Sequence, residues 1–219
     1  MKKYFFILAA AAALAACAKN EVTPVLSQEN TEIAYNVAPK TKTLAANQEN
    51  FAQGNVFASW AYYLPKDQTW AANSATSQPY IVNSTISHKD GTWKDKNKSY
   101  YWPKDGGSLT FLAYSLNKGD LNLAGTDSHF NCTNTHGING AIDLAANKNT
   151  DFLVADIAAD KTANENQYVF NGVPTLFKHK LSRVACTVKK AADYADKKFE
   201  LEEINFLNVA TYGSYGQLP

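Results

Sequence analysis

Short runs of alternating apolar and polar residues recur along most of the chain and predict an all-β fold. The clearest runs lie at 56–64, 80–86, 109–115 and 152–155, and each is bounded by Pro, Gly, Asp, Asn or Ser. An apolar residue at every second position is what a half-buried strand requires. No helical period is sustained after residue 16. We therefore expect an antiparallel, transthyretin-like β-sandwich of about nine short strands.

The run at 109–115 differs from the others because both sets of alternating positions carry apolar residues. Such a strand is typical of a central position with both faces packed. A weaker alternation at 33–37, inside the polar segment 18–53, predicts a first strand. Shorter strands are expected around Trp93, at 99–103 and at 168–170. The segment 117–149 is crowded with Gly, Asn, Asp and Thr, and we expect it to be a long irregular loop.

The C-terminal part of the chain predicts two more strands. Apolar residues alternate through 174–188, and we expect the part from Phe177 to Val188 to lie in the core. Residues 199–206 contain good helix formers, yet a strand with a bulge at Glu202-Glu203 fits their apolar positions better than a helix does.

The first residues resemble the export signal of a bacterial lipoprotein. Lys2 and Lys3 precede a short apolar run at 4–13, and the sequence Leu-Ala-Ala-Cys at 14–17 resembles a lipobox. We expect residues 1–16 to be removed as a signal peptide and Cys17 to carry the lipid. Residues 17–30 would form a flexible tether and residues 31–219 the β domain. The expected location is the outer membrane, with the domain exposed at the cell surface.

Composition narrows the function further. The leader holds two of the 21 basic residues, which leaves 19 against 20 acidic residues, so no electrostatic case for nucleic acid remains. Beyond Cys17 the chain has two cysteines, Cys132 and Cys186, and export permits a disulfide between them. The alternative is that Cys186 is a small core residue of a strand.

Few residues could act in catalysis or bind a metal ion. We expect that the protein is not an enzyme, that it binds no cofactor and that it has no metal site. Asp127, His129, Cys132 and His136 stand close together in sequence, but flexible polar loops collect such residues by chance. His179 is expected to be a polar core residue rather than a catalytic base. Nucleophile-elbow, zinc-protease and phosphate-loop motifs do not occur in the sequence.

The aromatic and turn residues, taken in order, resemble the fimbrillin family of Mfa-like lipoproteins, whose members build or anchor type V pili. The similarity extends over about residues 40–216 and is carried by Trp93, Tyr101-Trp102-Pro103, the runs 107–115 and 151–155, the segment 177–189, Leu207-Asn208-Val209 and Tyr212-Gly213.

This resemblance implies a fimbrial subunit, or an anchor or accessory lipoprotein, that assembles with other subunits by strand exchange and supports adhesion. In the family, a protease removes an N-terminal segment and exposes a groove for a strand of the next subunit. The sequence has no arginine before Arg183, so Lys40 and Lys42 are the candidate maturation sites. An uncleaved anchor subunit also fits the missing arginine.

A monomeric surface lipoprotein that binds host or bacterial glycans is the main alternative, and a hydrolase of unfamiliar fold is a further one. Glycan binding would require exposed aromatic side chains that stack on sugar rings, and the candidates are Trp70, Trp93, Tyr100 and Trp102. The opposing reading is that these aromatic residues belong to the core.

Overall fold

The computed structural model of the chain describes residues 31–39, 51–117, 121, 130–145, 150–163, 172–182, 184 and 186–217. These residues form eleven β-strands, one short helix α1 (Trp70–Asn73) and two single 3-10 turns, η1 (Ser74–Thr76) and η3 (Ala192–Tyr194). None of the helices in the described part of the chain has the length and apolarity needed to cross a bilayer. The all-β class expected from the sequence is confirmed.

The larger sheet closes on itself through the pairing of β2 with β5. It is built from β1 (Tyr35–Pro39), β2 (Val56–Leu64), β3 (Gln78–Lys89), β4 (Thr92–Asp95), β5 (Ser108–Ser115), β8 (Leu153–Ala155), β9 (Ala158–Lys161) and β10 (Val173–His179). Seven of these strands follow one another around a ring in the order β2, β3, β4, β1, β10, β8 and β5, and β5 pairs again with β2. The eighth strand, β9, also pairs with β5. This barrel-like closure differs from the transthyretin-like sandwich expected from the sequence.

A second sheet lies in the region that the sequence analysis expected to be irregular. Its strands are β6 (Phe130–Thr133), β7 (Gly137–Asp143) and β11 (Tyr212–Gly216), in the order β11, β7, β6. β6 and β7 form a hairpin, so the prediction of an irregular loop throughout 117–149 is wrong for 130–143. Residues 118–120, 122–129 and 146–149 of that segment lie outside the described residues, as does the strand expected at 168–170.

Strands β2 and β5 separate two apolar cores. Phe57 and Ala61 of β2 and Phe111 of β5 face the barrel interior, and their neighbours at alternate positions face the second sheet. Every residue of β5 is buried, which confirms that this strand is packed on both faces. Along β2 and β5 the two cores therefore share a wall, as strand alternation dictates.

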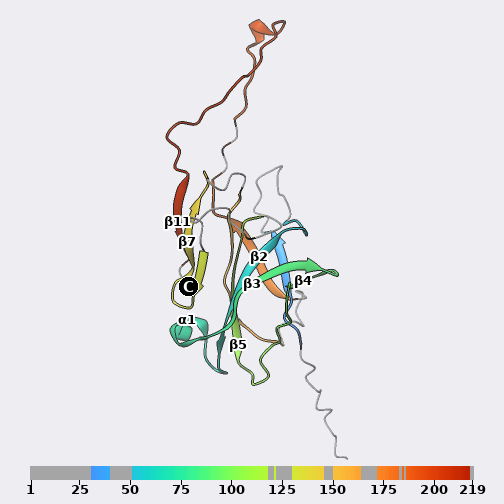
Figure 1. The fold of residues 1–219 in the computed structure, drawn as a ribbon, viewed down its shortest axis with the longest axis vertical. Coiled ribbons are helices and arrows are strands. Elements are labelled where there is room, and N and C mark those ends of the chain that lie inside the picture. Colours follow the sequence, from blue (N-terminus) through green and yellow to red (C-terminus); the bar gives the residue numbers. More distant parts are fainter. Residues whose placement is uncertain are drawn as a thin grey trace, which may run out of the picture.

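The described residues from 181 to 211 extend away from the barrel as a long arm and return to begin β11 (Figure 1). Apolar side chains of the arm are exposed, with Val184 at 68%, Phe199 at 69% and Phe206 at 56%. The prediction of a core strand through Val188 is therefore wrong beyond His179, and the strand predicted at 199–206 does not form. The physical reason is the lack of a partner strand. β8 runs antiparallel to β10 and begins at Leu153, opposite His179, so β10 has no neighbour beyond His179, and no described strand lies beside the arm.

Candidate functional site: the first strand and the groove that it fills

The first strand completes the barrel by lying between β4 and β10. It pairs in parallel with β10 from Tyr35↔Val173 to Pro39↔Phe177. Its contact with β4 is a single antiparallel pair, Tyr35↔Trp93. Just before the strand, the Ile33 amide donates to the Tyr100 carbonyl at 2.8 Å. β1 is therefore the strand that joins the two halves of the ring, and we call the space between β4 and β10 the β1 groove.

Alternation places the side chains of this segment in the barrel core. Ile33 and Tyr35 are 3% and 4% exposed, and Val37 is partly buried against the same core. The Tyr35 ring meets Phe57 edge to face at a centroid distance of 5.4 Å and Phe111 at 5.8 Å. Edge-to-face contacts of this kind add to the stabilisation from area burial. The groove is thus lined by aromatic residues that the first strand covers.

Two polar contacts fix the segment in the groove. The Tyr35 hydroxyl donates to Ser59 Oγ at 3.0 Å inside the core. Burial raises the pKa of Tyr35, so the phenol stays neutral and able to donate. At the rim, Glu32 forms an ion pair with Lys94. The hydrogen bond from Lys94, with a second from Ser99, lowers the pKa of Glu32.

Gly172 lets the backbone of β1 approach β10 closely. A Cβ atom at this position would lie 2.8 Å from the Ala34 carbonyl oxygen and 2.9 Å from the Tyr35 carbonyl carbon. The glycine also adopts a φ of +140°, which side chains disfavour. The next amide, Val173 N–H, donates to the same Ala34 oxygen at 2.8 Å. The chemistry of the groove is therefore strand binding through the backbone, with aromatic side chains below.

The residues predicted for anchoring and maturation cannot be placed. Cys17, Lys40 and Lys42 lie outside the described residues, although the two lysines directly follow β1 in sequence. Cys132 and Cys186 are both free thiols. Cys132 is buried in β6 and Cys186 is exposed on the arm, so the predicted disulfide is not formed in this structure and Cys186 is not a core residue.

The other candidates for chemistry are scattered. Asp127 and His129 lie outside the described residues, and His136 bonds to the neighbouring Thr135 hydroxyl. Within the described ranges, no three His, Cys, Asp or Glu side chains come close enough to hold a metal ion. His179 is exposed and paired with Asp151 at 2.7 Å, so its prediction as a core residue is wrong.

The tryptophans proposed for stacking on sugars belong to the core. Trp70, Trp93 and Trp102 are 4%, 9% and 6% exposed, and Tyr100 packs against the barrel core while partly buried. A sugar would have to displace packed protein to reach any of the three indole rings. The glycan-binding alternative therefore loses the aromatic residues on which it depended.

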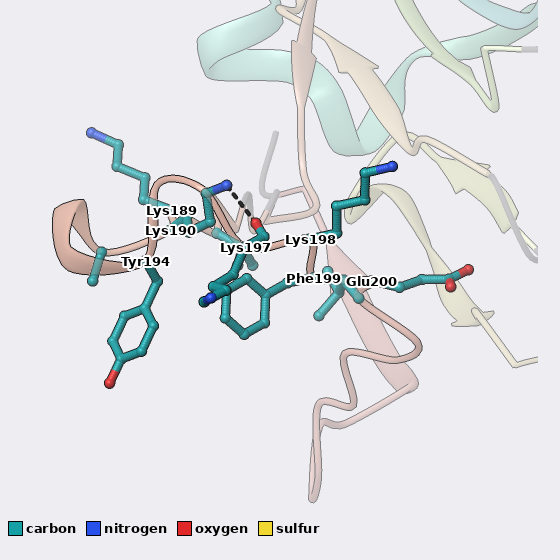
Figure 2. Close-up of a pocket in the computed structure, with 10 residues that line it drawn as sticks. Lys189, Lys190, Tyr194, Lys197, Lys198, Phe199 and Glu200 are labelled. Carbon is teal, nitrogen blue, oxygen red and sulfur yellow. Dashed lines mark hydrogen bonds between the residues drawn. The ribbon is translucent and has the colours of Figure 1, made fainter.

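A hollow of about 1160 Å³ lies on the arm, but its side chains do not converge. Figure 2 shows Lys189, Tyr194 and Glu200 pointing in different directions. The contact drawn there is the Lys190 ammonium donating to the Lys197 carbonyl at 2.8 Å. These residues shape the tip of the arm and do not form a chemical site.

The residues that hold β1 in the groove include Ser59, Gly172, Glu32 and Lys94, and none of them was predicted from the sequence to be functional. The pair Asn171-Gly172 is a turn signal that could have drawn attention to the glycine. No local signal links Ser59 to Tyr35, because the two residues meet only in the folded barrel.

Comparison with known proteins places the chain in a family. The fimbrillin-like family model matches residues 41–218. Among solved structures, a fimbrial protein from Bacteroides vulgatus is 23% identical with a TM-score of 0.47, and the match covers 68% of this chain and 45% of that protein. A Bacteroides uniformis protein named for cell adhesion is 17% identical with a TM-score of 0.34, covering 68% and 47% respectively. The chain thus spans less than half the length of either structure. No curated protein matches. Because the family model covers most of the sequence, this chain belongs to the fimbrillin-like family.

Proposed function

We propose that the chain is the precursor of a cell-surface fimbrial subunit, in which β1 occupies a groove that later receives a strand from another subunit. The observation that carries this proposal is the position of β1, which closes the barrel by pairing with β10 and is followed at once by two lysines. Membership of the fimbrillin-like family supports the same role. The protein would act by assembly and adhesion rather than by catalysis.

The contacts of β1 are of the kind that another strand can reproduce. Five successive residues pair through backbone atoms with β10, and backbone pairing does not depend on sequence. Burial of the Ile33 side chain adds about 1.5–3 kcal/mol, and the ring of Tyr35 is buried beside it. A strand with apolar residues at alternate positions would gain both the backbone pairing and the side-chain burial. An empty groove would instead expose Phe57 and Phe111.

Cleavage after Lys40 or Lys42 would disconnect β1 from the rest of the chain. To test maturation, both lysines are replaced in one variant, Lys40→Gln with Lys42→Gln, and Lys104→Gln in an exposed turn serves as the control. The double variant should lose detergent-resistant ladders of surface material, and the control should keep them. Ladders that persist in the double variant would rule out these sites.

Before maturation, the lipid on Cys17 would hold the precursor at the outer membrane. Residues 1–16 would serve as the signal peptide, residues 17–30 as the tether and residues 31–219 as the assembling domain. The variant Cys17→Ser should move the protein from the membrane fraction to the soluble fraction. If fractionation does not change, lipid attachment at this cysteine is excluded.

A further inference from the structure

The β1 groove contains a buried polar contact among side chains that are mainly apolar. Ser59 is fully buried on β2, and its neighbours in the barrel core are aromatic and aliphatic. Its hydroxyl accepts the hydrogen bond from Tyr35 at 3.0 Å and donates a long one to the Leu112 carbonyl at 3.5 Å. The first strand therefore supplies the short hydrogen bond of this hydroxyl.

A strand without a phenol in this position would leave Ser59 poorly satisfied. The void beside Tyr35 and Phe111 measures about 10 Å³, at the lower limit of what a water molecule needs, and Ser59 is not among the residues that line it. Water is thus a poor substitute for the tyrosine hydroxyl. A buried hydroxyl that loses its partner carries a larger penalty than the bond itself would suggest.

The register of the incoming strand is also restricted. Val173 N–H donates to the Ala34 carbonyl, and Gly172 provides the space in which this backbone lies. A shift by one residue would turn Tyr35 out of the barrel and bring its neighbours in. The hydroxyl can therefore reach Ser59 in one register of the parallel pairing with β10.

We propose that the β1 groove selects strands that carry a tyrosine between two aliphatic residues, in the arrangement of Ile33, Tyr35 and Val37. Ser59 recognises the tyrosine by accepting a hydrogen bond from its hydroxyl. The partner is an extended segment of another protein chain with the order aliphatic–x–tyrosine–x–aliphatic. This inference rests on the proposed function, because it requires the groove to accept a strand.

The test uses the full chain with a site-specific protease sequence placed within 41–50. After cleavage, a labelled peptide with the sequence of residues 31–39 is added in excess, and exchange is followed by fluorescence anisotropy. A second peptide carries Tyr35→Phe, and a third exchanges the positions of Ala34 and Tyr35. The third has the same composition but turns the tyrosine outward.

The tyrosine peptide should bind about tenfold more tightly than the phenylalanine peptide, as the loss of one buried hydrogen bond predicts. In a Ser59→Ala chain this preference should disappear or reverse, because the buried tyrosine hydroxyl then lacks its acceptor and the phenylalanine peptide buries no unpaired hydroxyl. Equal binding of both peptides to the unmodified groove would overturn the selection while leaving strand uptake intact. Binding of none of the peptides would overturn strand uptake, and the selection with it.

A second measurement applies if the cleaved chain does not stay folded. In the intact chain, Tyr35→Phe, Ser59→Ala and the double variant form a thermodynamic cycle read by urea denaturation. The double variant should lose clearly less stability than the sum of the single variants. Additive losses would mean that the two hydroxyls are not coupled, and would overturn the proposal.

Discussion

Replacing Gly172 by alanine should displace β1 while the rest of the barrel stays folded. The added Cβ would lie 2.8 Å from the Ala34 carbonyl oxygen, and the atoms that it meets belong to the backbone of the first strand. Backbone cannot rotate out of the way as a side chain can, so the strand itself must move. Strain at a φ of +140° adds to the clash, and the two effects together should cost roughly 2–4 kcal/mol.

Hydrogen exchange locates this loss. The reporting amides are those of Ile33, Val173 and Trp102, each bonded across the edges of the first strand's segment. A cost of ~2 kcal/mol corresponds to about thirtyfold faster local opening. Gly91→Ala is the matched control, since this glycine also has a positive φ, at +79°, but nothing lies within 4 Å of the added Cβ. Equal protection of the three amides in the two variants would refute the crowding argument.

Three further predictions follow from burial and charge. Because the ion pair with Lys94 lowers the pKa of Glu32, it stabilises the fold at pH values above the carboxyl's ordinary pKa of 4.5, and this stabilisation is lost as pH falls through the lowered value. β1 should therefore open faster as the solution becomes more acidic than pH 4.5, and Glu32→Gln should flatten that dependence in exchange measurements. In a Cys17→Ser background, a thiol reagent should label Cys186 rapidly and Cys132 only on unfolding, because burial raises the pKa of Cys132 to about 12; fast labelling of both thiols in the folded protein would contradict this. Leu112→Ala, in the wall between the two cores, should cost about 2–5 kcal/mol in urea denaturation, whereas Val82→Ala at an exposed position should stay within ~0.5 kcal/mol.

The strands that the sequence predicted well are those whose partners are close in the chain or whose faces are both packed. Residues 56–64 and 109–115 carry enough apolar side chains to be recognised without a structure, and they became β2 and β5. Closure of the barrel could not be inferred from the sequence, because it depends on which edge strands of the sheet pair with each other, here β2 with β5. The hairpin of β6 and β7 was missed because its strands are rich in polar and small residues.

In the arm, by contrast, the sequence predicted a strand that the structure does not contain. Residues 199–206 have an alternation typical of a strand, yet Phe199 and Phe206 are exposed and no described strand pairs with them. Periodicity reports that a segment suits a sheet, and it says nothing about whether a neighbouring strand is available. The candidate site has the same limit. The first strand was expected at 33–37 from its own sequence, but its contacts with Ser59 and Gly172 depend on residues far away in the chain.

The most direct test of strand replacement is the N-terminal sequence and intact mass of the protein recovered from assembled surface fibres. If β1 gives way to a strand from another subunit, the recovered chain should begin at Thr41 or Thr43 and lack residues 31–39. Protein that still begins at the lipidated Cys17 and retains β1 within the fibres would contradict the account.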